Sequence, residues 1–154
     1  VFPEPQPKLT PTPVLPGLDG RKMSKSYGNT IDIGEDEAGL RAKVAKMVTD
    51  PQKVRRGDPG RPEICPVFAL HELFTVNEVD VIARDCRSGA LGCVDCKKNL
   101  ANHLAQALAP VWERRRQWEN KPKDVEDILM AGADRARKEA ETTLCLVRQA
   151  MHLN

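Results

Sequence analysis

Two lysines and two serines stand together in the run Lys22-Met23-Ser24-Lys25-Ser26, with glycines on both sides of the run. The backbone N–H groups of such a loop, together with two ammonium groups, can close around a polyphosphate. Lysine binds phosphate as a compact point charge, which suits negative charge that builds on a departing pyrophosphate. The residues therefore predict a phosphate-binding loop, and the alternative is a solvated basic loop.

Four of the five cysteines form a second set that could do chemistry: Cys65, Cys86, Cys93 and Cys96, in the pattern C-x20-C-x6-C-x2-C. The last two stand three residues apart at the start of an expected helix, so both sulfurs can face one point. Four thiolates suit zinc or an iron–sulfur cluster. A four-cysteine zinc ribbon usually has two C-x2-C pairs, and the single pair here favours [4Fe–4S], with Zn²⁺ as the alternative. Small buried thiols are the interpretation without a metal.

Cations that could bind RNA phosphates come next. The net charge is only +2, so any nucleic-acid site must arise from local clustering of cations. The candidate residues are Arg84, Arg87, Lys97, Lys98 and Arg114, with Trp112 or Trp118 as surfaces for stacking bases. Alternatively, each of these cations belongs to an ordinary charged helix face that is exposed to solvent. For Trp112 the alternative is that its ring packs in the core.

The elements that must position these residues are predicted to be mainly α-helical. Residues 1–34 form an irregular arm, because six prolines fall in the first 16 residues and oppose helix. Residues 35–154 are predicted to form a bundle of about five helices. We expect a strand nowhere, except a short one before Pro16.

Apolar residues at helical spacing predict the individual helices. The first begins near Glu35 and ends before Pro51, the second begins at Pro66, and the third runs from Asn77 as N-cap to Ser88-Gly89. A long helix is expected from about Val94 to Trp118, and the last begins at Pro122 with an apolar stripe that includes Ile128 and Leu144.

The composition also bears on the compartment. An odd number of cysteines without a secretory signal argues against a disulfide framework and predicts a reducing, cytoplasmic location. No run of residues approaches the roughly 18 apolar residues of a membrane span, so no membrane is expected as a partner.

The lysine loop carries a resemblance to a known family. Lys22-Met23-Ser24-Lys25-Ser26 resembles the KMSKS signature of class I aminoacyl-tRNA synthetases, and the flanking segments PGLDGR and YGNTI resemble those of tryptophanyl-tRNA synthetases. The likeness extends along nearly the whole chain, through Asp58-Pro-Gly-Arg-Pro62 to Gly132-Ala-Asp-Arg-Ala-Arg137.

This resemblance implies an ATP site, used with Mg²⁺, formed by Met23, Ser24, Lys25 and Ser26. Lys25 would contact the pyrophosphate of ATP, Lys22 would assist it, and Met23 would lie near the adenine. Some bacterial members carry a [4Fe–4S] cluster on a quartet that ends in the same C-x6-C-x2-C pattern. The resemblance thus implies that residues 1–34 end a catalytic domain, and that residues 35–154 are a helical anticodon-binding domain.

The partners implied by the resemblance are tRNA(Trp), tryptophan, ATP and, in the whole enzyme, a second copy as a homodimer. The histidine motif that such enzymes use is not found, because no histidine precedes His71. The chain therefore resembles the carboxy-terminal portion of a tryptophan–tRNA ligase and is expected to be inactive alone. The alternative is a stand-alone, non-catalytic helical module that binds a metal and RNA.

Overall fold

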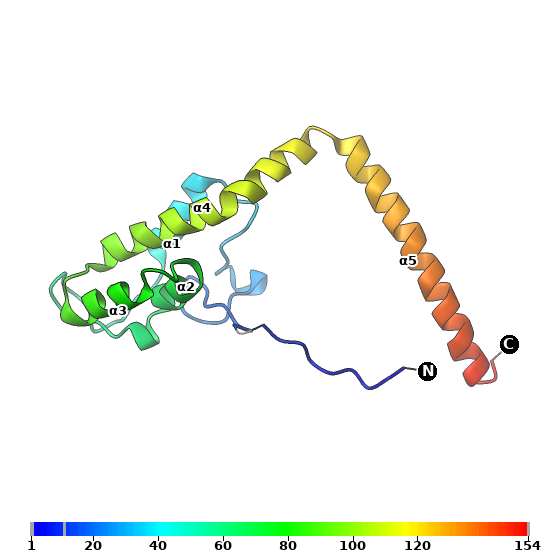
Figure 1. The fold of residues 1–154 in the computed structure, drawn as a ribbon, viewed down its shortest axis with the longest axis horizontal. Helices are drawn as coiled ribbons and strands as arrows, with labels where there is room; N and C mark the ends of the chain where they lie inside the picture. Colours follow the sequence, from blue (N-terminus) through cyan, green and yellow to red (C-terminus); the bar gives the residue numbers. More distant parts are fainter. Residues whose placement is uncertain (1, 11, 154) are drawn as a thin grey trace. The chain divides into compact units, whose positions relative to one another are not determined.

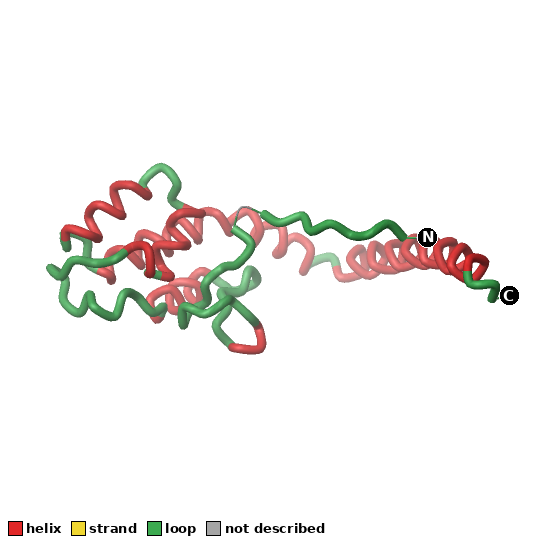
Figure 2. The backbone as a smooth tube through the Cα atoms, turned by 90° about the horizontal axis from the view of Figure 1, so that it is seen from below, coloured by secondary structure: helices red, strands yellow, loops and turns green. Residues whose placement is uncertain are grey.

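The computed structural model describes residues 2–10 and 12–153, and these residues are mainly helical (Figure 1). The five α-helices are α1 (Glu37–Lys46), α2 (Pro66–Phe74), α3 (Val79–Ser88), α4 (Cys93–Glu119) and α5 (Pro122–Ala150). Two short 3-10 turns, η1 (Lys25–Tyr27) and η2 (Pro62–Ile64), precede α1 and α2 respectively. Among the described residues there is no strand (Figure 2). Where a short strand was expected before Pro16, the structure has one isolated β-bridge, between Pro16 and Lys22.

The described chain divides into two compact units, residues 10–113 and residues 2–9 with 114–153. The core of the first unit is formed by apolar residues of α1, α2 and α4 and by Met47, which directly follows α1. The residues from the three helices are Leu40, Val44, Val67, Leu70, Leu100, Ala101, Leu104 and Ala105. Trp112 packs against this core, and its Nε1 donates a hydrogen bond to the Ile33 carbonyl at 2.9 Å. The core interpretation of Trp112 is therefore correct.

Local sequence explains where several helices begin and end. Asp36 caps α1 by accepting a hydrogen bond from the Gly39 N–H at 2.7 Å, and Pro66 stands in the first turn of α2, where its missing N–H leaves no bond unmade. Gly89 ends α3 with a φ of 81°, in the left-handed region that favours glycine. The predicted N-cap of α3 is one residue early, because Glu78 and not Asn77 precedes its first turn.

The first predicted helix was expected to continue through Met47 and Val48, but α1 ends at Lys46. Beyond it the backbone is extended, and the Val48 N–H donates to the Leu18 carbonyl at 2.9 Å. This bond ties the end of α1 to the lysine-containing arm. A contact across thirty residues of chain therefore overrides the local helical pattern.

The last helix departs from the expectation of a bundle. The apolar stripe of α5 predicts burial, yet none of its described residues is buried, and Ile128 and Leu129 remain 54% and 67% exposed. The periodicity correctly predicts the helix but does not specify a surface against which it packs. None of the described helices combines the length and apolar character needed to cross a membrane.

Candidate functional site

The lysine loop is held in shape by one buried side chain, Asn29, which is 3% exposed. Its Oδ1 accepts a hydrogen bond from the Ser24 N–H at 2.8 Å, and its Nδ2 donates to Asp19 Oδ1 at 2.7 Å and to the Lys22 carbonyl at 3.2 Å. The Asn29 side-chain amide therefore hydrogen-bonds to three residues of the loop, Asp19, Lys22 and Ser24. The Lys22 and Lys25 side chains remain exposed at the surface of this braced loop, where a polyphosphate can reach them.

Electrostatics reinforce the same loop. The hydrogen bond from the Asn29 side chain, together with the neighbouring Arg21, lowers the pKa of Asp19 to about 2. Arg21 pairs with Asp19 at 2.6 Å and lies over the Tyr27 ring, 4.5 Å from its centroid. The described contacts of Arg21 therefore brace the loop, while the two lysines supply its outward positive charge.

Replacing Asn29 with alanine is expected to loosen the loop, because the Ser24 N–H and the Lys22 carbonyl lose their partner. The expected loss is about 1–3 kcal/mol of unfolding free energy, the usual cost of leaving buried polar groups unpaired. Urea unfolding and limited proteolysis between residues 20 and 30 measure it. Asn77→Ala, at an exposed position, is the matched control, and equal behaviour of the two variants would contradict the bracing role.

The second site is a cavity of about 20 Å³ that all four cysteines of the quartet line. Cys65 precedes α2, Cys86 lies in the last turn of α3, and Cys93 and Cys96 lie in the first turn of α4. All four thiols therefore lie at helix ends around one cavity, and Cys93 and Cys96 share it as their spacing predicts. As the side chains stand, no group of three or more His, Cys, Asp or Glu residues in the described chain is arranged to hold a metal ion.

Burial and mutual proximity govern the thiols. Burial, together with the nearby Cys65, Cys86 and Cys93, raises the pKa of Cys96 to about 12. Burial also raises the pKa of Cys86, while the Lys53 ammonium opposes that rise. Burial thus favours the protonated form of the Cys86 and Cys96 thiols, so a metal bound there must displace their protons.

His71 lies against the inner thiol. It is fully buried, its Nδ1 lies 2.8 Å from the Thr75 hydroxyl oxygen, and its Nε2 lies 3.3 Å from Cys96 Sγ. The Thr75 hydroxyl donates to the His71 carbonyl at 2.7 Å, and Nε2 also lies 3.2 Å from the Cys96 carbonyl oxygen, so the ring contacts both the backbone and the thiol of Cys96. Burial lowers the pKa of His71. His71 therefore packs beside Cys96, one of the thiols that line the cysteine cavity.

The loop of residues 49–61 closes the cavity on another side. Lys53 is 7% exposed, and its Nζ donates to the Asp58 carbonyl and, at 3.4 Å, to the Cys86 carbonyl. A side chain at Gly60 would place its Cβ 2.6 Å from Cys86 Sγ, so only glycine allows this approach. Sequence reasoning assigned no role to this loop, because a glycine and a lysine between prolines resemble any surface turn.

Asp50 fastens the same loop. It is 4% exposed and accepts from Arg61 Nη2 at 2.6 Å, Arg61 Nε at 3.0 Å and the Gln52 N–H at 2.9 Å. The Arg61 guanidinium holds the pKa of Asp50 well below its usual range.

Acid is expected to weaken the fold through Asp19 and Asp50. Both folded pKa values lie below the unfolded value of about 3.9, so the stabilisation is complete above about pH 4 and declines as the pH falls below it. Urea unfolding between about pH 2.5 and pH 6 measures this slope. Asp50→Asn, which cannot ionise, is expected to flatten the profile, and an unchanged profile would contradict the assignment.

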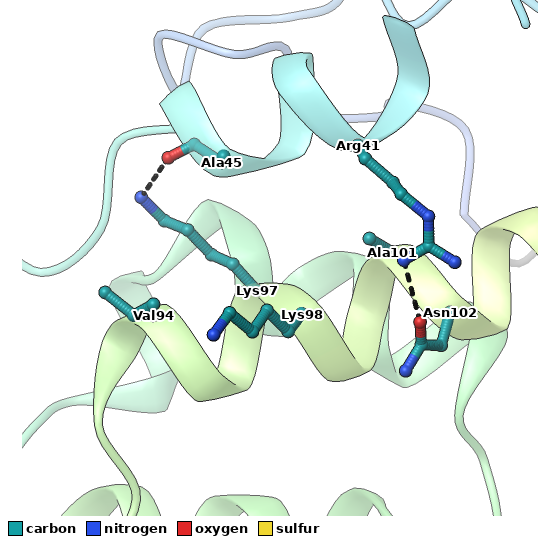
Figure 3. Close-up of a pocket in the computed structure, with 7 residues that line it drawn as sticks. All are labelled: Arg41, Ala45, Val94, Lys97, Lys98, Ala101 and Asn102. Carbon is teal, nitrogen blue, oxygen red and sulfur yellow. Dashed lines mark hydrogen bonds between the residues drawn. The ribbon is translucent and has the colours of Figure 1, made fainter. Parts of the chain in front are cut away.

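The third site is a pocket of about 490 Å³ between α1 and α4 (Figure 3). Its lining residues are Arg41, Ala45, Val94, Lys97, Lys98, Ala101 and Asn102. Two hydrogen bonds cross it: Arg41 Nη1 donates to Asn102 Oδ1 at 2.8 Å, and Lys97 Nζ donates to the Ala45 carbonyl at 3.0 Å (Figure 3). The predicted RNA-binding lysines therefore line a pocket. Sequence reasoning missed Arg41 and Asn102, because residues sixty apart give no common pattern.

The remaining predicted cations are engaged elsewhere. Arg84 pairs with Asp85 at 2.9 Å, and Arg87 pairs with Glu63 at 2.5 Å. Arg114 lies in the second unit and has an interaction of its own. These three arginines do not line the α1–α4 pocket. Two of the five predicted RNA contacts are thus brought together.

Comparison with known proteins places these sites in context. A tryptophan–tRNA ligase of Aquifex aeolicus is 51% identical over 155 residues, which cover 99% of this chain and 39% of the ligase. One of Thermotoga maritima is 46% identical, covering 99% of this chain and 47% of the ligase. The chain thus spans less than half the length of these relatives.

A solved structure agrees with the sequence relatives. The tryptophanyl-tRNA synthetase of Campylobacter jejuni, complexed with ADP and tryptophan, superposes with a TM-score of 0.75 at 30% identity, covering 91% of this chain and 44% of that one. The profile of the family described as tRNA synthetases class I (W and Y) matches residues 1–109, which contain all three sites. The chain belongs to the class I tRNA synthetases of this W and Y family.

Proposed function

We propose that this chain supplies the pyrophosphate-binding loop and the tRNA-binding helical part of a tryptophan–tRNA ligase. The observation that carries the proposal is the lysine loop braced on Asn29, in a chain 51% identical to such a ligase. In the whole enzyme the tryptophan carboxylate attacks the α-phosphorus of ATP, and pyrophosphate leaves. The activated tryptophanyl group then passes to tRNA(Trp). Such an enzyme would act in the cytoplasm, as a homodimer.

Within this scheme residues 1–34 end the catalytic domain and carry the ATP loop. Lys25 is assigned to the leaving pyrophosphate and Lys22 assists it, because a fixed ammonium stabilises charge that develops on phosphate oxygens. Met23, Ser24 and Ser26 complete the ATP site. Met23 and Ser24 are half-buried while both lysines are exposed, which fits a loop that holds its backbone and presents its charges.

Residues 35–154 are proposed as the part that binds tRNA. Lys97 and Lys98 contribute cations at the α1–α4 pocket, and Arg84, Arg87 and Arg114 are assigned to phosphates away from it. Phosphate contacts of this kind position RNA and make its binding salt-dependent.

The cysteine quartet is proposed to hold a [4Fe–4S] cluster, with Zn²⁺ as the competing occupant. The donor set fits either group, because four thiols line one cavity and the one carboxylate there, Asp50, is already bonded to Arg61. As the side chains stand they form no metal-binding group among the described residues, so either occupant would require the thiols around this small cavity to reorient. Either group would supply a rigid link between the starts of α2 and α4 and the end of α3.

Selective binding of tRNA tests the RNA part of this proposal. Fluorescence anisotropy compares labelled tRNA(Trp) with a non-cognate tRNA at fixed salt. Tighter binding of tRNA(Trp) is expected. Equal and weak binding of both RNAs would contradict the proposal.

A further inference from the structure

The pocket between α1 and α4 has the size and lining of a site for a planar ligand. Its volume of about 490 Å³ lies within the range of pockets that hold small molecules. Ala45, Val94 and Ala101 give it an apolar floor, and Val94 is 66% exposed. An exposed apolar floor with cations around it is suited to an aromatic ring that is linked to a negatively charged group, such as a phosphate.

Arg41 offers a fixed planar face at this pocket. Its Nε and Nη2 donate to Glu37 Oε1 at 2.8 and 2.6 Å, and its Nη1 donates to Asn102 Oδ1 at 2.8 Å. A guanidinium held at three nitrogens keeps one plane, and such planes stack on unpaired bases. Asn102 Oδ1 is used by Arg41, while its Nδ2 makes no hydrogen bond within the described chain and can donate to the edge of a base.

The charge of the pocket suits the phosphates beside such a base. Lys97 is anchored on the Ala45 carbonyl, and Lys98 Nζ is exposed with no hydrogen-bond or ion-pair partner among the described residues. A neighbouring cavity of about 480 Å³ shares Val94 and is lined by Lys53, Arg55 and Arg56, and Arg56 pairs there with Asp95 at 3.4 Å. Cations therefore continue past the pocket, in the manner of a surface that follows a single strand.

We propose that this pocket receives one unstacked base of a single-stranded tRNA segment, stacked on Arg41, with Lys98 on an adjacent phosphate. The inference rests on the proposed function and adds to it the site where a base is held. The RNA strand then continues over Val94 toward Arg55 and Arg56.

A plug in the pocket is the direct test. Ala45→Phe fills the site without changing charge, and Ala107→Phe places the same ring at an exposed position of α4 outside the pocket. The probe is a labelled anticodon-arm RNA of tRNA(Trp). Ala45→Phe is expected to weaken its binding by about 5- to 150-fold, the cost of one lost stacked base. Ala107→Phe is expected to leave it unchanged, and circular dichroism confirms that both variants are folded.

Abasic substitutions identify the base. With the unaltered protein, removing one particular loop base is expected to weaken binding as much as the plug does. With Ala45→Phe the same abasic RNA is expected to lose nothing more, because the contact is already gone. Fully additive losses at every position would overturn the proposal.

A charge variant keeps the proposal testable if the plug perturbs the helices. Lys98→Gln is expected to reduce the slope of log affinity against log salt by about 0.7, the value for one lost phosphate contact on a single strand. Lys123→Gln on α5 is the control. If the protein binds the RNA but neither Ala45→Phe nor Lys98→Gln changes binding, this inference fails and the proposed function stands. If the unaltered protein does not bind the RNA, the proposed function itself fails.

Discussion

Lys25→Ala is expected to slow tryptophan activation by about 10²- to 10³-fold, the usual cost of removing one group that stabilises developing charge. The protein for this test is a chimera in which this chain replaces the segment that it matches in the Aquifex aeolicus ligase. The exposed Lys25 ammonium loses its contact with the leaving pyrophosphate, and no other described side chain depends on it. The rate of tryptophan-dependent ATP–pyrophosphate exchange is the measurement.

The controls separate the role of Lys25 from general damage. Lys123→Ala removes an exposed lysine of α5 and is expected to leave the rate unchanged. Lys22→Ala is expected to cause a smaller loss than Lys25→Ala, because Lys22 is assigned an assisting role. If the Lys25→Ala chimera is as active as its parent, the proposal that Lys25 stabilises the leaving pyrophosphate is contradicted.

Cys96→Ser is expected to abolish metal binding, because a serine hydroxyl is a poor substitute for a thiolate ligand. Protein purified without oxygen is expected to be brown, with iron and sulfide in nearly equal amounts. In Cys96→Ser both are expected to fall to near zero and the Tm to drop, since metal binding contributes free energy to folding. Cys145→Ser, at an exposed position of α5, is the matched control.

Metal analysis separates the possible occupants of the cysteine cavity. A colourless protein that contains zinc would overturn the cluster and keep the thiolate metal centre. A folded, metal-free protein whose stability does not change in Cys96→Ser would overturn both and leave the quartet as buried thiols.

Local chemistry predicts much of this fold. Pro66 and Pro122 correctly predict the starts of two helices, and Gly89 correctly predicts the end of a third, because missing N–H groups and a positive φ are properties of single residues. The early end of α1 is not predictable in this way. It depends on the bond from the Val48 N–H to the Leu18 carbonyl, which only the folded chain brings together.

The candidate sites likewise include features that local sequence predicts and features that depend on the folded chain. The lysine loop and the quartet are predictable because each has a compact signature, Lys22 to Ser26 or Cys86 to Cys96. The contributions of Asn29 and Arg41 are not, since a single amide or guanidinium has no signature until its partners are in place. The apolar stripe of α5 is the opposite case, because its period predicts the helix while its Ile128 remains exposed.

The most direct test of the central claim is the rate at which the unaltered chimera attaches tryptophan to tRNA(Trp). If this chain supplies the pyrophosphate loop and the tRNA-binding part of such an enzyme, the chimera will charge tRNA(Trp) at a rate close to that of the Aquifex aeolicus ligase. A chimera that is folded and binds tRNA(Trp), yet attaches no tryptophan, would contradict the claim.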